Sequence, residues 1–174
     1  MFSNTIPGSP RLAAAAEPCY NIVVTLRWIL AFLHLLALPI GVAAIFVRAR
    51  ALRAFARGAD PNNAVSADLW WGVAAFIWIS TGLIRWLAGI EKPMPYYTQN
   101  WLFHAKLTML LVILILEVRP IVVIGRWRKQ LRKQQPIDTK AADAMATTSY
   151  IQLALAVLML LAATGMARGV GAFD

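Results

Sequence analysis

WLFHAKLTMLLVILIL, at residues 101–116, is apolar enough to cross a membrane, yet it carries an imidazole and an ammonium group at His104 and Lys106. A charged side chain near the bilayer centre costs about 2.5–3.5 kcal/mol on insertion scales, so it usually faces the protein interior or a polar cavity. Residues two apart on a helix point to nearly opposite sides, about 200° apart. The segment therefore predicts a membrane helix with one polar side chain turned inward, either His104 or Lys106.

The composition of the whole chain agrees with a membrane protein. Of its 174 residues, 60% are hydrophobic and 14% are charged, whereas a soluble domain is about 45–50% apolar. The alternating pattern of a membrane β-barrel is absent from the sequence. At about 20 residues for each span, the length accommodates four helices. We predict an all-α integral membrane protein, folded as a four-transmembrane-helix bundle.

The predicted spans cover residues 27–47, 69–89, 101–124 and 149–168, within one membrane domain at 23–174. Residues 1–22 contain several prolines and are expected to form an irregular tail outside the membrane. Ser66 and Asp68 are candidate N-caps of the second span. Glu117, near the end of the third span, is expected to pair with Arg119 or Arg126 or to face water.

The formal net charge of +9 comes mainly from the connections between the spans. Four arginines follow the first span and seven basic residues lie between Arg119 and Lys140, whereas the connection at 90–100 has only Lys92. The positive-inside rule then places both basic connections in the cytoplasm and both termini outside. We expect a multi-pass protein of a bacterial inner membrane with periplasmic termini and no nucleic-acid partner.

Nitrogen-bearing side chains from all four spans fall in one layer of the outward half. At 1.5 Å per residue, His34 lies roughly 10 Å deep, His104 roughly 5 Å, Arg85 and Lys106 about 5–8 Å, and Arg168 near the surface. These five are the candidate cofactor-binding residues. His34 and His104 are candidate metal ligands of a b-type haem, and the cationic side chains are candidate partners of its propionates. The alternatives are histidines that hydrogen-bond between helices and cations that reach out to the interface.

Residues typical of an enzyme active site are not apparent in the sequence. There is no phosphate-binding glycine loop, no nucleophile with an arranged base and no pair of carboxylates. The single cysteine, Cys19, forms no metal-ligand pair. A hydrolase or a kinase is therefore disfavoured.

Four short segments resemble those that recur in a family of predicted four-helix bacterial membrane proteins, classed as domain of unknown function number 2214. The segments are LRWILAFLH at 26–34, TGLIR at 81–85, NWLFHAKL at 100–107 and MARG at 166–169. The resemblance covers all four predicted spans. It implies a four-helix inner-membrane protein and assigns no activity.

A more distant similarity is to the HemJ-type protoporphyrinogen oxidases, which are small four-helix bundles that bind haem b. They have a histidine in the first span, where His34 stands, and a Lys-Leu pair opening the third, where Lys106 and Leu107 stand. The similarity implies a porphyrin site that uses His34, with Lys106 near it, rather than the pair of histidines. The chain has ALPIG at 37–41 in place of their Trp-x-Gly-Leu segment, a departure that bears on the oxidase activity more than on the porphyrin site.

The sequence leads us to expect a membrane-embedded b-type haem protein that takes part in electron transfer, as a subunit of a respiratory or dehydrogenase complex. One alternative is a cofactor-free structural or assembly subunit whose Arg85 and Lys106 bind a partner chain or an anionic lipid. Another is a HemJ-like porphyrinogen oxidase. The expected partners are the lipid bilayer and other membrane subunits or further copies of the chain.

Overall fold

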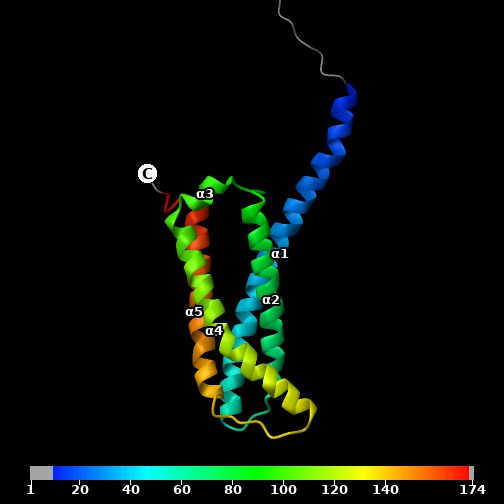
Figure 1. Cartoon of the computed structure of the whole chain (residues 1–174). Helices are drawn as coiled ribbons and strands as arrows, with labels where there is room; N and C mark the ends of the chain where they lie inside the picture. Colours follow the sequence, from blue (N-terminus) through cyan, green and yellow to red (C-terminus); the bar gives the residue numbers. More distant parts are fainter. Residues whose placement is uncertain (1–9, 173–174) are drawn as a thin grey trace, which may run out of the picture.

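The computed structural model describes the backbone of residues 10–172 and the side chains of residues 20–172. The elements are α1 (Pro10–Ala56), α2 (Asn62–Leu87), α3 (Met94–Thr98), α4 (Trp101–Arg132) and α5 (Ala142–Ala167). The four long helices form an elongated bundle, from which the first part of α1 and the last part of α4 diverge, and the short α3 crosses one end (Figure 1). Each long helix contains an apolar stretch long enough to cross a membrane. These elements confirm the all-α membrane fold.

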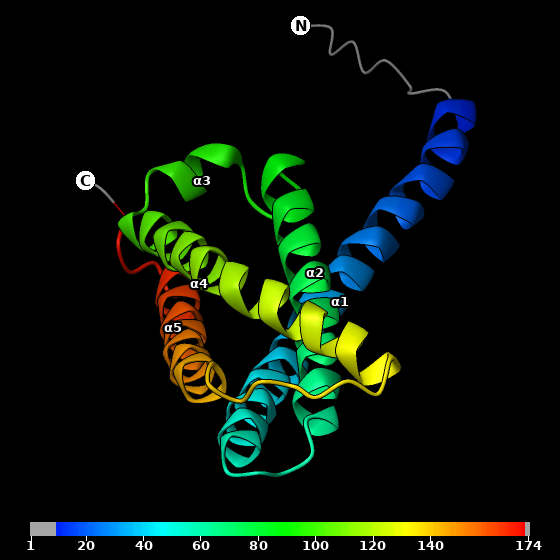
Figure 2. The ribbon, with the colours of Figure 1, turned by 60° about the horizontal axis from the view of Figure 1, so that its bottom comes forward.

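The packing of the helices leaves the side of the bundle between α2 and α4 less closed than the others. Helix α1 packs extensively against α2 and α5, and α5 packs against α4, whereas α2 and α4 touch little. Helix α3 links the ends of α2 and α4, and we name this the α3 end of the bundle. At the opposite end, here named the basic end, the connection from α4 to α5 runs past the α1–α2 hairpin (Figure 2).

The bundle is apolar outside as well as inside. Large hydrophobic side chains on its outer surface are largely exposed, including Leu35 at 66%, Phe76 at 73% and Ile115 at 62%. In a bilayer these side chains face lipid tails, which are as apolar as a protein interior. The inward faces form three apolar clusters, one at each end and one in the middle. At the basic end, Phe55 and Trp127 meet edge to face at 5.1 Å.

The helices extend beyond the predicted spans, mainly at the basic end. Helix α4 continues to Arg132. Arginine and lysine are good helix formers, and Ile124 and Trp127 face inward and pack in the apolar cluster at the basic end. Pro120 lies inside α4 and removes a backbone donor. In Figure 1 the helix changes direction in this yellow-green part and crosses toward α2 at the basic end.

Two predictions about helix beginnings are wrong. Helix α1 starts at Pro10, so residues 10–22 are helical rather than irregular; proline is tolerated in the first turn and the alanine run that follows favours helix. Residues 1–9 of the predicted tail lie outside the described residues. Helix α2 begins at Asn62, before both candidate caps, and the carboxylate of Asp60 accepts a hydrogen bond from the backbone amide of Asn62 at 2.9 Å.

The C-terminal segment is tied to the start of α4. The amide of Trp101 donates to the carbonyl of Gly171 at 2.9 Å, and the side-chain amide of Asn100 donates to the carbonyl of Val170 at 3.0 Å. Gly171 has a φ of 86°, and a Cβ there would lie 2.9 Å from the Asn100 side-chain oxygen. Glycine therefore suits this position for two reasons, its conformation and the space available.

Candidate functional site

His34 lies on the inward face of α1 and is held by α2. Its Nδ1 atom is 3.1 Å from the carbonyl oxygen of Trp78 and 2.9 Å from the hydroxyl oxygen of Thr81. The carbonyl can only accept, so Nδ1 carries the proton in a neutral ring and Nε2 carries the lone pair. Gly82 permits this approach, because a Cβ there would lie 3.1 Å from Cε1 of the ring.

Lys106, and not His104, faces the interior of the bundle. The inward stripe of α4 has spacings of three and four residues, as helix packing requires. It consists of Phe103, Lys106, Leu110, Ile113, Glu117, Pro120, Ile124 and Trp127. His104 is exposed on the other side of the helix, where its Nε2 is 3.0 Å from the carbonyl of Thr98. The structure therefore does not bring His34 and His104 together as a ligand pair.

Arg85, in the last turn of α2, completes a cluster of nitrogen donors with His34 and Lys106. The positive charges of Arg85 and Lys106 are close enough to His34 to act on it electrostatically. Arg85 pairs with the carboxylate of Glu91 through one terminal nitrogen, but its buried Nε has no partner among the described residues. Lys106 likewise has no hydrogen-bond or carboxylate partner there. We name His34, Thr81, Arg85 and Lys106 the outer polar layer.

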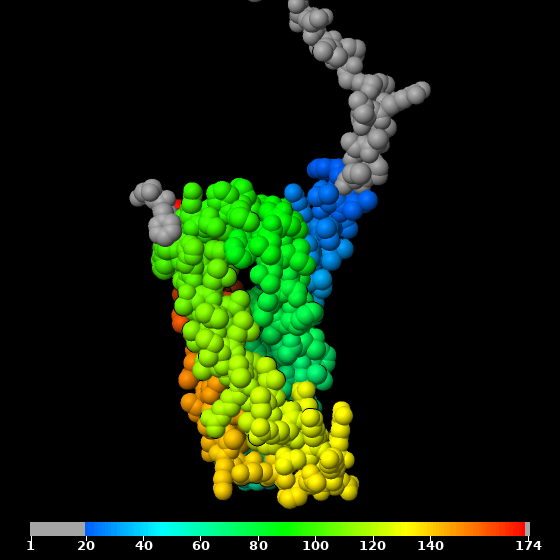
Figure 3. Space-filling view, viewed as in Figure 1, coloured from blue at the N-terminus to red at the C-terminus, as the bar shows by residue number. Residues whose placement is uncertain are grey.

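Aromatic side chains lie between this layer and the α3 end. Trp86 contacts Phe103 at 5.0 Å between ring centroids, and Tyr97 contacts Phe103 at 5.5 Å. Burial, and then the neighbouring Glu91 carboxylate, raises the pKa of the Tyr97 phenol above its usual value. The indole nitrogen of Trp86 is buried without a partner among the described residues. Figure 3 shows a small opening at this level between the bright green surface of α2 and the yellow-green surface of α4.

Arg168 does not join the outer polar layer. It is the exposed C-cap residue of α5, where its amide bonds the carbonyl of Gly165. Of the five residues predicted for the site, the structure therefore brings together His34, Arg85 and Lys106. His104 and Arg168 lie outside that group.

A second polar group, absent from the sequence prediction, lies inside the bundle toward the basic end. Its centre is Arg48, whose side chain is fully buried. Arg48 donates to the carboxylate of Glu117 through both terminal nitrogens, at 2.6 and 2.9 Å. It also donates to Asp68 at 2.9 Å, to Gln152 at 2.8 Å and, through Nε, to Ser149 at 3.2 Å. All four long helices meet at this guanidinium.

The remaining contacts balance the charge of this group. Arg128 donates to the second oxygen of Asp68 at 2.7 Å, and the Gln152 amide donates to Glu117 at 2.6 Å. Two guanidiniums therefore face two carboxylates. We name Arg48, Asp68, Glu117, Arg128, Ser149 and Gln152 the inner polar layer.

The predicted partners of Glu117 are wrong. Arg119 is only two residues away on the same helix and so points to the other side, whereas Glu117 belongs to the inward stripe and meets Arg48. The sequence held a usable signal: Glu117 follows Lys106 by about three helical turns, and Arg48 follows His34 by about four. Glu117 therefore shares a helix face with Lys106, and Arg48 shares one with His34.

The two layers differ in what their donors can still bind. A guanidinium has five N–H donors, and Arg48 makes five hydrogen bonds to side chains. The inner polar layer is thus complete and acts as a structural clamp. In the outer polar layer, nitrogen atoms of Arg85 and Lys106 remain without partners among the described residues, so this layer is the candidate binding site.

The donor set of the outer polar layer suits an anionic ligand more than a free metal ion. Within residues 20–172 there is no group of three or more His, Cys, Asp or Glu side chains that would hold a metal. The layer offers one neutral imidazole and two cations. Such a set fits a ligand that carries carboxylates for the two cations and a metal ion for the imidazole.

Comparisons with known proteins place the chain in a family. No curated protein and no solved structure matches it. The model of the family described as predicted membrane protein (DUF2214) matches residues 26–171, which include both polar layers and all four membrane spans. The chain therefore belongs to this family of predicted membrane proteins.

Proposed function

We propose that the outer polar layer binds a b-type haem, with His34 as the protein ligand of the iron, and that the protein uses it for electron transfer in a bacterial inner membrane. The observation that carries the proposal is the anchoring of His34 Nδ1 by Trp78 and Thr81. Histidines that bind metals usually donate their other ring nitrogen to a carbonyl or carboxylate, which fixes the ring and leaves the remaining nitrogen free to coordinate.

The two cations supply the second part of the site. A cation inside a membrane protein costs free energy unless an anion compensates it. The ammonium of Lys106 has no such partner among the described residues, and the guanidinium of Arg85, although paired with Glu91, keeps an Nε–H donor without a partner there. Carboxylates bind guanidinium and ammonium groups through strong, charge-assisted hydrogen bonds. Propionates placed between α2 and α4 would satisfy both side chains.

Bound at this site, haem would supply a one-electron redox centre. Thr81 and Trp78 would orient the imidazole, Arg85 and Lys106 would hold the carboxylates, and the aromatic residues near α3 would limit the access of water. The proposal assigns no role to His104 or Arg168, because both lie outside the layer. It therefore agrees with the porphyrin site implied by the HemJ resemblance rather than with two histidine ligands.

The experiment is a reduced-minus-oxidised absorption spectrum of the detergent-purified protein from haem-replete cells. We expect Soret and α bands in the wild type, their loss in His34→Ala, and their retention in the matched control His104→Ala. Thr81→Val is expected to weaken haem retention by about 10–100-fold, as loss of a supporting hydrogen bond does at metal sites.

Two results would overturn the proposal. A colourless wild-type preparation would favour the cofactor-free structural subunit. Equal loss of the bands in His34→Ala and His104→Ala, with both variants still folded, would remove the single-ligand assignment.

A further inference from the structure

A groove of about 990 Å³ opens on the lipid-facing side of the bundle near the basic end. Its floor is α1, one wall is α2, and Tyr150 of α5 closes the other side. Alanines at positions 43, 51 and 54 keep the floor low. The groove is separate from both polar layers, none of whose residues lines it.

The groove is strongly basic at one end. Arg50, Arg53 and Arg57 line it, all three are exposed, and its lining includes no Asp or Glu. Arg53 lies over the ring of Tyr150 at 4.5 Å, and Arg50 lies over the ring of Phe46 at 5.8 Å. These contacts hold the guanidiniums along the groove without neutralising their charge.

The other end of the groove is apolar. Ile40 and Val47 line it from α1, and Trp70, which is 60% exposed, lines it from α2. From Ile40 to Arg53 the helix rises roughly 20 Å. Half of a bilayer's hydrocarbon core is about 15 Å thick, so the groove spans the distance from the membrane midplane to the headgroups of one leaflet.

We propose that this groove binds one anionic phospholipid of the leaflet at the basic end. Its phosphate lies among Arg50, Arg53 and Arg57, and an acyl chain follows α1 toward Ile40. The match rests on charge complementarity at one end and apolar lining at the other. Guanidinium groups bind phosphate through paired hydrogen bonds, and basic groups beside the membrane attract anionic lipids.

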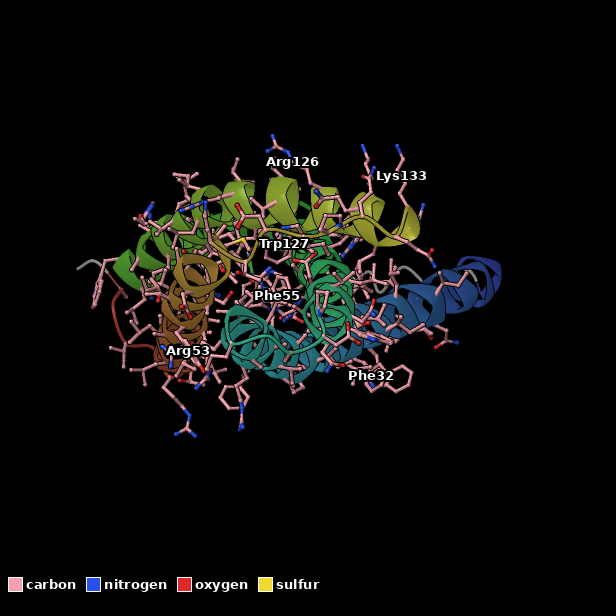
Figure 4. All side chains as sticks on the ribbon, turned by 90° about the horizontal axis from the view of Figure 1, so that it is seen from below. Phe32, Arg53, Phe55, Arg126, Trp127 and Lys133 are labelled. Atoms are coloured by element: carbon pink, nitrogen blue, oxygen red, sulfur yellow. The ribbon has the colours of Figure 1, made fainter. Side chains whose placement is uncertain are left out.

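The chain provides its own control for general attraction between basic residues and lipid. Arg126 and Lys129 on α4 and Lys133, the C-cap residue of α4, are equally numerous and also exposed, but none of them lines the groove. Seen from the basic end, Arg53 points away from one side of the bundle, whereas Arg126 and Lys133 point away from the opposite side (Figure 4).

The test is native mass spectrometry of the full chain in detergent, titrated with phosphatidylglycerol or phosphatidylcholine. We expect one tightly retained phosphatidylglycerol in the wild type and in the control variant R126Q/K129Q/K133Q. The groove variant R50Q/R53Q/R57Q is expected to bind it at least about tenfold more weakly. Ala43→Trp fills the groove without changing the charge and is also expected to weaken binding.

Three outcomes would overturn the proposal: equal weakening in the groove and control variants, equal retention of the two lipids by the wild type, or displacement of the lipid by inorganic phosphate. Circular dichroism checks that each variant keeps its helices. If the groove variant fails to fold, Ala43→Trp still decides the question, because normal lipid retention by this variant would contradict the proposed site.

Discussion

Replacing Arg48 with methionine would remove the guanidinium at the centre of the inner polar layer while keeping a side chain of similar length. Glu117 would then lose both of its charged contacts and keep only the amide of Gln152. Asp68 would still be paired with Arg128. The damage is therefore concentrated on one buried carboxylate.

The magnitude follows from this asymmetry. Removing one partner of a buried ion pair costs about 3–5 kcal/mol, and we expect Arg48→Met to lie near the lower value, about 3 kcal/mol, because Asp68 keeps its second partner. Glu117→Gln leaves an excess positive charge and is expected to cost about 2 kcal/mol. In the double variant the remaining Asp68 and Arg128 balance each other, so the cost should be about 2 kcal/mol below the sum of the single variants.

The assay is reversible unfolding in mixed micelles with increasing SDS, followed by helical circular dichroism. Arg126→Met is the matched control, because Arg126 is exposed and forms no ion pair among the described residues, and a change within about 0.5 kcal/mol is expected there. If Arg48→Met behaved like this control, or if the single-variant costs were simply additive, the clamp described here would be refuted.

Three further predictions concern the α3 end and the orientation of the chain. Gly171→Ala is expected to destabilise the protein by about 1–3 kcal/mol in the same assay, because Gly171 has a positive φ. The control Gly72→Ala is expected to be neutral or stabilising, because nothing lies within 4 Å of the new Cβ. Equal effects of the two substitutions would contradict the geometry. In a Cys19→Ser background, His104→Cys should react with a maleimide at least about tenfold faster than Lys106→Cys, because position 104 is exposed and position 106 faces inward. Similar rates at the two positions would contradict this assignment of the helix faces. A tag at the C-terminus should be accessible to protease in intact spheroplasts, as the distribution of basic residues predicts, and protection of the tag would invert the topology.

The number and order of the membrane helices follow from the sequence because hydrophobicity is the dominant signal in a bilayer. The ends of the helices do not. Ile124 and Trp127 belong to a core at the basic end, and nothing in their own segment distinguishes a helix that continues beyond the membrane from a loop rich in arginine. The start of α1 is equally hard to predict, because the prolines near it indicate an irregular segment although the helix accommodates them.

The sequence predicts how deep in the membrane the residues of the candidate site lie, but not which side of each helix faces the bundle interior. Counting residues from the outer boundary placed His34, Arg85 and Lys106 at similar levels, and the structure brings these three together. Hydropathy cannot say which side of α4 faces inward, because lipid and protein interior are equally apolar. Arg48 has no signal of burial in its own segment, because it immediately precedes other arginines at the end of a span and so resembles the start of a cytoplasmic loop.

The position of Arg48 also constrains the order in which the chain can assemble. Its partners Asp68, Glu117, Ser149 and Gln152 follow it by 20, 69, 101 and 104 residues. The two counter-charges, Asp68 and Glu117, arrive with α2 and α4, whereas α5 supplies two neutral partners, Ser149 and Gln152. All five N–H donors of Arg48 have partners only once α5 has packed against α1, so we expect the packing of α5 to complete the inner polar layer.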